Sequence, residues 1–136
     1  MKPRIPTILL SLSSAILIFG GAMHALAFVQ KAASVIGSAN VAPFFASELK
    51  VLWLADSTTL VLTGGFFAFI AIKPSAASRL VVILVAAVPA ATTVLLYSFL
   101  GNFYAAHLLA VASAMAIAAA LLTDAPAVVG APRRQA

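Results

Sequence analysis

Two histidines and one aspartate are the residues of this sequence best suited to chemistry. His24, Asp56 and His107 each lie inside a long apolar segment. An ionisable side chain within such a segment costs roughly 2.5 to 3.5 kcal/mol even on a lenient membrane-insertion scale, so it is a candidate for function. Histidine titrates near neutral pH and can exchange a proton with a carboxylate. We therefore take these three residues as candidate catalytic residues, with Asp56 and a histidine acting as an acid and base pair.

The composition indicates which elements carry these residues. Of 136 residues, 64% are hydrophobic and 8% are charged, whereas soluble domains carry about 25% charged residues. The mean hydropathy of +1.16 also lies outside the soluble range. We expect one membrane domain over residues 1–124, followed by a disordered cytoplasmic tail at residues 125–136, which contains Pro126, Gly130 and Pro132.

Four apolar runs are long enough to cross a hydrocarbon layer of about 30 Å, which needs about 20 helical residues. Their apolar residues are continuous instead of alternating, which favours helices over barrel strands. The sequence predicts an all-α membrane protein, a bundle of four transmembrane helices, with spans near residues 7–29, 51–72, 80–100 and 103–122. Residues 30–50 are expected to form an outer connection, although Pro43 suits the first turn of a helix that begins early.

Lysine and arginine residues predict the orientation of the bundle. One side of the predicted membrane has six of them and the other has only Lys31 and Lys50. The six are Lys2, Arg4, Lys73, Arg79, Arg133 and Arg134. The positive-inside rule then places both termini in the cytoplasm, as for a multi-pass protein of the bacterial inner membrane. Because these cations are scattered instead of gathered on one face, the net charge of +5 does not predict nucleic-acid binding.

The first apolar run has a second interpretation. Lys2 and Arg4, the apolar residues after them and the segment Ala25-Leu26-Ala27 resemble a secretory signal with its cleavage site. Cleavage would remove the first helix and leave three spans. The run is longer than the roughly 7 to 15 apolar residues of a signal core, so we expect the first helix to remain as a span.

The candidate residues are predicted to lie at one depth. His24 lies five residues before the outer end of the first span, Asp56 five residues into the second and His107 four residues into the fourth. With a rise of about 1.5 Å per residue, all three lie about 6 to 8 Å below the outer boundary. Tyr97 lies slightly shallower in the third span. We therefore expect an outward-facing polar pocket formed by His24, Asp56, Tyr97 and His107.

Helical spacing adds residues to this pocket. Glu48, Asp56 and Thr59 fall along one stripe of the second span, and Thr93 and Tyr97 along one stripe of the third. The candidates for ligand binding are Tyr97, Trp53, Thr59, Thr93, Tyr104 and Glu48.

Each of these residues also has an ordinary role in a membrane helix. Thr59 and Thr93 can bond to the backbone of their own helices. Trp53 and Tyr104 can belong to the aromatic belt at the membrane surface. Glu48 can lie in water or among lipid headgroups.

Two functions use the pocket for an organic molecule. In the first, Asp56 and a histidine bind an apolar or lipid-like ligand that enters from the outer leaflet, and exchange a proton with it. In the second, His24 and His107 are the axial ligands of a b-type haem held between two helices. Covalent c-type haem is excluded because the sequence has no cysteine.

Two further functions need no organic ligand. His24, His107 and Asp56, with Glu48 nearby, could supply the nitrogen and oxygen ligands of a divalent metal such as Zn²⁺ or Cu²⁺. Alternatively, the polar residues only fix helix packing in a non-enzymatic accessory subunit, which associates with a membrane partner or with a second copy of itself. The residues fit all four functions, enzymatic and non-enzymatic, and membrane lipids are expected partners in each.

The segment Gly20-Gly21-Ala22-Met23-His24, near the outer end of the first of four spans, resembles the small DoxX-like membrane proteins of bacteria. Chain size and span number also resemble that group. The segments around Asp56 and from Tyr97 to His107 have no counterpart in it. The resemblance implies a membrane redox or accessory role and assigns no catalytic residue.

Overall fold

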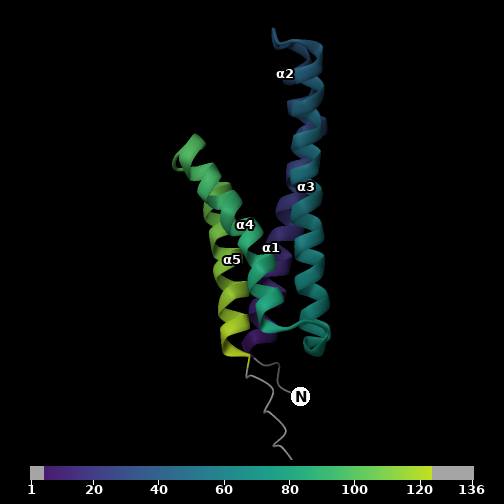
Figure 1. Cartoon of the computed structure of the whole chain (residues 1–136). Coiled ribbons are helices and arrows are strands. Elements are labelled where there is room, and N and C mark those ends of the chain that lie inside the picture. The colour runs from purple at the N-terminus through teal and green to yellow at the C-terminus, as the bar shows by residue number, and fades with distance from the viewer. Residues whose placement is uncertain (1–4, 124–136) are drawn as a thin grey trace, which may run out of the picture.

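Helices account for nearly all of the described part of the chain, residues 5–123, in a computed structural model (Figure 1). Four of the helical segments there are long and apolar enough to cross a membrane, which confirms the predicted all-α four-helix bundle. The elements are α1 (Ile5–Ala27), the π-helical segment η1 (Phe28–Ala32), α2 (Ala33–Ser38), α3 (Pro43–Ile72), the 3₁₀ turn η2 (Pro74–Ala76), α4 (Arg79–Leu100) and α5 (Tyr104–Leu122). The tail predicted at residues 125–136 lies outside the described residues.

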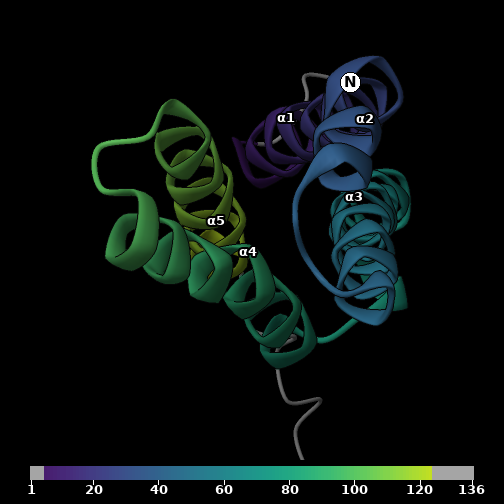
Figure 2. The ribbon, with the colours of Figure 1, turned by 90° about the horizontal axis from the view of Figure 1, so that it is seen from above.

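The bundle is organised around α1. This helix packs against α3 on one side and α5 on another, and α4 packs mainly against α5 (Figure 2). Few residues of α3 and α4 meet, and the α1–α3 and α4–α5 pairs diverge toward the end of the bundle that carries α2 (Figure 1). We call this the α2 end. The start of α1 and the end of α5 lie at the opposite end, so the membrane domain begins and finishes on one side (Figure 1).

The first two spans are longer than the sequence predicts. α1, η1 and α2 form one continuous helical segment of 34 residues, Ile5–Ser38, and α3 has 30 residues. The connection expected at residues 30–50 is limited to residues 39–42. Residues 30–36 contain no proline or glycine to stop a helix, and Pro43 occupies the first turn of α3, where its missing N–H has no cost. The early start of α3 at Pro43 is confirmed.

These lengths make the α1–α3 pair project beyond the α4–α5 pair. At about 1.5 Å per residue, the 34 residues from Ile5 to Ser38 extend about 51 Å and α3 about 45 Å. α4 and α5, with 22 and 19 residues, extend about 33 and 29 Å, close to the thickness of a hydrocarbon layer. Figure 1 shows the resulting hairpin of α2 and the first half of α3 above the α4–α5 connection.

Two glycines permit the close approach of α1 and α3. A Cβ atom on Gly21 would lie 2.8 Å from the backbone oxygen of Ser57, and one on Gly64 would lie 2.7 Å from Cγ1 of Ile18. Transmembrane helices commonly use small residues in this way to bring their backbones together. Gly20 and Gly65, their sequence neighbours, have no atom within 4 Å of such a Cβ. The glycine of the contact is therefore Gly21 and not its neighbour Gly20.

Buried serines connect the remaining helices. Ser13 of α1 donates to the backbone oxygen of Ala112 in α5 at 2.8 Å, and Ser113 of α5 donates to that of Ala86 in α4 at 3.2 Å. Ala112 and Ala86 are fully buried, so the helices are close enough for a short side chain to reach the neighbouring backbone. The core thus combines small residues with hydrogen bonds between helices.

Substitution of the four glycines tests the α1–α3 contact. Gly21→Ala and Gly64→Ala should each destabilise the protein by about 1–3 kcal/mol, because the added methyl group overpacks the interface. Gly20→Ala and Gly65→Ala are matched controls and should be neutral or slightly stabilising, since alanine is about 1 kcal/mol better than glycine inside a helix. The measurement is the melting temperature in mild detergent, followed by circular dichroism. Equal melting temperatures for all four variants would contradict the close contact.

Candidate functional site

The candidate catalytic residues belong to two separate groups. His24 and Asp56 lie together where α1 meets α3, whereas His107 and Tyr97 lie together where α4 meets α5. Within residues 5–123, no hydrogen bond or ion pair joins the two groups, and their helix pairs diverge at this end (Figure 1). The single pocket expected from all four residues is therefore not formed. Equal depth in a membrane does not place residues on facing sides of their helices.

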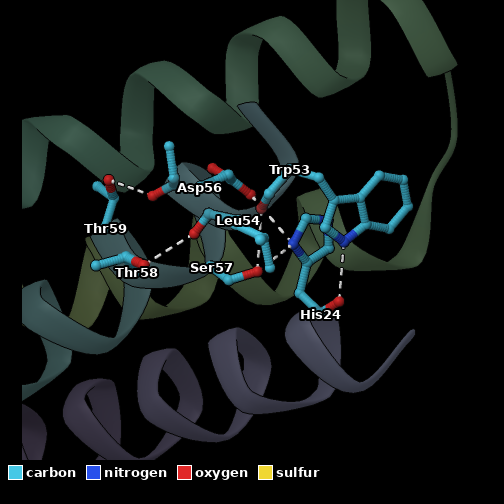
Figure 3. A network of polar contacts seen from close by, with 8 residues as sticks. His24, Trp53, Leu54, Asp56, Ser57, Thr58 and Thr59 are labelled. Carbon is cyan, nitrogen blue, oxygen red and sulfur yellow. Dashed lines mark hydrogen bonds and ion pairs between the residues drawn. The ribbon is translucent and has the colours of Figure 1, made fainter. Parts of the chain in front are cut away.

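The first group is centred on the imidazole ring of His24 (Figure 3). Its Nδ1 lies 2.9 Å from Oγ of Ser57 and 3.8 Å from Oδ2 of Asp56. The ring stacks on the indole of Trp53 with centroids 4.5 Å apart and planes inclined by 5°. Trp53 Nε1 also donates to the backbone oxygen of His24 at 2.9 Å. We call His24, Trp53, Asp56 and Ser57 the His24 cluster.

Local sequence explains how this cluster is assembled. Trp53 and Ser57 are four residues apart, so they lie on the same face of α3 and both face α1. Gly21, about one turn before His24, lets α1 approach the backbone of Ser57. The π-helical segment η1 begins four residues after His24, and the N–H of Ala33 bonds to the oxygen of Phe28, five residues earlier. Such segments occur frequently at functional sites.

Ser57 was not among the residues expected from the sequence. It is buried, with 4% of its surface exposed, and it contacts His24 directly. The available signal was its spacing of four from Trp53, which places a hydroxyl beside an aromatic side chain on one helical face. A serine inside an apolar helix more often bonds only to its own backbone, so the spacing alone did not distinguish it.

The hydrogen bonds of Ser57 indicate which ring nitrogen of neutral His24 carries the proton. The hydroxyl of Ser57 has one hydrogen and donates it to the backbone oxygen of Trp53 at 3.1 Å. Its oxygen must then accept from Nδ1 of His24. This leaves Nε2 unprotonated and able to act as a base. The carboxylate of Asp56 lies 3.8 Å from Nδ1, on the same side of the ring as Ser57.

The same geometry excludes a hydrolytic triad, although serine, histidine and aspartate are all present. In a triad, the serine bonds to one ring nitrogen and the aspartate to the other. Here Ser57 and Asp56 both approach Nδ1 of His24, and the hydroxyl of Ser57 is buried. The His24 cluster can therefore bind a polar group or transfer a proton, but Ser57 is not placed as a nucleophile.

The second group joins α4, the α4–α5 connection and α5. Nδ1 of His107 bonds to the hydroxyl of Tyr97, and Nε2 lies 2.7 Å from Oδ1 of Asn102. Asn102 follows Gly101, whose φ of 65° allows the chain to turn. Because both ring nitrogens of His107 have partners, this group, which we call the His107 tie, fixes the turn between the two helices. Asn102 was not among the candidate site residues expected from the sequence.

The remaining ligand-binding candidates lie apart from His24. Thr59 and Thr93 donate to backbone oxygens of their own helices, each at 2.8 Å, which is the ordinary role foreseen for them. Tyr104 is 71% exposed beside Phe103, and Glu48 is exposed on the projecting part of α3. Of the predicted candidates, only Trp53 therefore joins His24 and Asp56.

The structure does not assemble the metal and haem ligands considered above. Within residues 5–123, no three His, Cys, Asp or Glu side chains are close enough to hold one metal ion. His24 and His107 occupy different helix pairs, and His107 already has both nitrogens bonded. The predicted pairing of these histidines, with or without Asp56, is not present.

A groove adjoins the His24 cluster. It is open, has a volume of about 280 Å³, and is lined by Ala27, Lys31, Ala32, Val35, Ile36 and Trp53. We call it the Trp53 groove. Trp53 belongs to both the groove and the cluster, so one indole ring separates an apolar surface from an ionisable pair.

The fold and the site define a helical multi-pass membrane protein with a half-exposed histidine–aspartate pair. Comparison with protein families, curated proteins and solved structures finds no match to this chain. The resemblance to DoxX-like proteins stays a prediction.

The hydrogen bonds predict opposite tautomers for the two histidines. Neutral His24 should carry its proton on Nδ1, because Ser57 accepts there, and neutral His107 on Nε2, because Oδ1 of Asn102 accepts there. Nitrogen-15 NMR of histidine-labelled protein distinguishes the two forms. Ser57→Ala should change only the signals of His24, and Tyr97→Phe only those of His107. Identical tautomers at both positions would contradict this assignment.

Proposed function

We propose that this protein binds a small amphipathic, lipid-like ligand in the bacterial inner membrane, with the polar end of the ligand at the His24 cluster and its apolar part in the Trp53 groove. The observation that carries the proposal is the shared indole of Trp53, which stacks on His24 and also lines the groove. Ligand sites typically combine a largely apolar wall with a few polar groups that fix orientation.

The polar end of the site has the groups needed to exchange a proton. The side chains of His24 and Asp56 are 31% and 40% exposed, so a ligand can reach them. In this proposal Nε2 of His24 takes the proton from the ligand, and the Asp56 carboxylate lies 3.8 Å from the other ring nitrogen. This chemistry acts on an ionisable or hydroxyl group of the ligand and makes the protein either a binding protein or a proton-transfer catalyst.

The charge distribution supports the membrane orientation. Lys31 and Lys50 lie at the α2 end, while Lys73 and Arg79 flank η2 at the opposite end. Together with the cationic residues near both termini, this pattern supports an orientation with the α2 end outside the cytoplasm. The ligand would then enter from the outer leaflet.

The ligands that remain bound after gentle purification test this function. Wild-type protein in mild detergent should carry a defined lipid-like molecule, detected by mass spectrometry of the extracted sample. Asp56→Asn and His24→Gln should each reduce its amount about tenfold, as expected when a charge-assisted contact is lost. Thr58→Ala is the matched control, because Thr58 is adjacent on α3 and bonds only to the backbone oxygen of Leu54.

Two results would count against the proposal. Unchanged ligand content in both variants would favour a non-enzymatic accessory subunit whose polar groups serve packing. An absorption spectrum with a Soret band, or stoichiometric metal, would favour the cofactor alternatives.

A further inference from the structure

Asp56 is an acidic side chain inside a membrane-spanning helix, and its charge has no cationic partner among the described residues. In residues 5–123, its ion-pair contact within 4.0 Å is Nδ1 of His24, and no lysine or arginine side chain lies that close to its carboxylate. Neutral His24 donates from Nδ1 to Ser57 and adds no positive charge. With a neutral imidazole, the His24 cluster therefore has a net negative charge.

The exposure of this group lets a ligand supply the positive charge. The side chain of Asp56 is 40% exposed and that of His24 is 31% exposed. A carboxylate inside a membrane span costs free energy unless a cation or hydrogen-bond donors offset the cost. An ammonium group bound here would form a charge-assisted contact with the carboxylate. An anionic group would be repelled, and a neutral group would leave the charge of Asp56 unbalanced.

Trp53 is a second feature that favours a cation. Trp53 and Asp56 are three residues apart, so their side chains are neighbours on the surface of α3. Figure 3 shows both of them beside the imidazole ring of His24. Among aromatic side chains, the indole of tryptophan attracts cations most strongly, through the negative faces of its ring system. A cation at Asp56 can therefore interact with a carboxylate and an aromatic ring together.

The Trp53 groove complements the remainder of such a ligand. Its surface is almost entirely apolar, and Trp53 is the lining residue that also contacts His24. Lys31 contributes to the lining through its alkyl chain, because the groove has almost no polar surface. A ligand with one cationic group and an apolar remainder therefore matches both parts of the site.

We propose that the ligand of this site is an amphipathic amine, whose protonated nitrogen contacts Asp56 and Trp53 and whose apolar part lies in the Trp53 groove. This inference rests on the proposed function and names the chemical class of its ligand. An ammonium group also carries the proton that the proposed function transfers. One N–H bond of the ligand breaks, an N–H bond forms at Nε2 of His24, and the ligand becomes a neutral amine while the positive charge stays in the site.

Fluorescence of Trp53, the single tryptophan of the chain, measures this binding directly. Brominated dodecylamine, in its protonated form, should quench the fluorescence saturably in nonionic detergent. Asp56→Asn should weaken the apparent affinity about tenfold, the size expected for one charge-assisted contact. Glu48→Gln is the matched control, because it removes the same charge from an exposed position of the same helix, and it should bind as wild type does. Melting temperatures of both variants control for folding.

The charge of the probe provides the second comparison. Brominated dodecanol should bind wild-type protein about tenfold more weakly than the amine, and should not distinguish wild type from Asp56→Asn. Brominated dodecanoate should bind wild type more weakly still, because Asp56 repels its carboxylate. Equal binding of amine and alcohol, or equal binding of the amine by wild type and Asp56→Asn, would overturn the cationic class. Stronger quenching by a brominated phosphatidylethanolamine, whose headgroup has no net charge, would overturn it as well.

The two proposals fail in different ways. If the molecule retained by wild type is neutral and is lost from Asp56→Asn and His24→Gln, the proposed function stands and the cationic class is wrong. If the amine binds in an Asp56-dependent manner while both variants retain the natural ligand, the proposed function is wrong and Asp56 binds cations independently of it.

Discussion

The rest of the structure depends on the close contact between α1 and α3. Gly21 and Gly64 have no Cβ, so the two backbones approach until Gly21 meets the backbone oxygen of Ser57. The hydroxyl of the same Ser57 contacts His24. One residue therefore joins the helix packing to the candidate site, and the position of the imidazole follows from how closely the helices pack. In a bilayer, where hydrophobic burial gives little drive for helices to associate, such steric fit is a principal source of specificity.

Much of the fold was predictable from the sequence because the bilayer imposes simple requirements. A span needs about 20 apolar residues, and its backbone must form a helix. The same reasoning underestimated the length of the first two helices. A polar or glycine-containing segment such as residues 30–50 does not end a helix unless one of its residues is unable to adopt helical geometry. It also foresaw the early start at Pro43, where the local chemistry of proline is sufficient.

The candidate site was only partly predictable. Helical rise gives the depth of a residue reliably, and so His24, Asp56, Tyr97 and His107 were all assigned to one level. Which residues meet depends on how each helix is rotated and on the divergence of α1–α3 from α4–α5, and neither follows from one sequence. The two histidines differ for the same reason: among residues 5–123, His107 has partners for both ring nitrogens, whereas His24 has partners only for Nδ1.

The π-helical segment at Phe28–Ala32 has a geometric consequence for the groove. A π-helical turn accommodates one more residue than an α-helical turn, and one residue corresponds to about 100° of rotation around the axis. Every side chain from Lys31 onward is therefore turned relative to the α1 residues that precede the segment. Removal of a single residue between Phe28 and Ala32 would restore α-helical geometry and keep Val35 and Ile36 on their present flank, whereas a deletion in the α-helical part of α1 would turn every later side chain by about 100°. The π-helical segment is therefore the place in the first span where a change of one residue in length is absorbed, without exchange of any side chain in the His24 cluster.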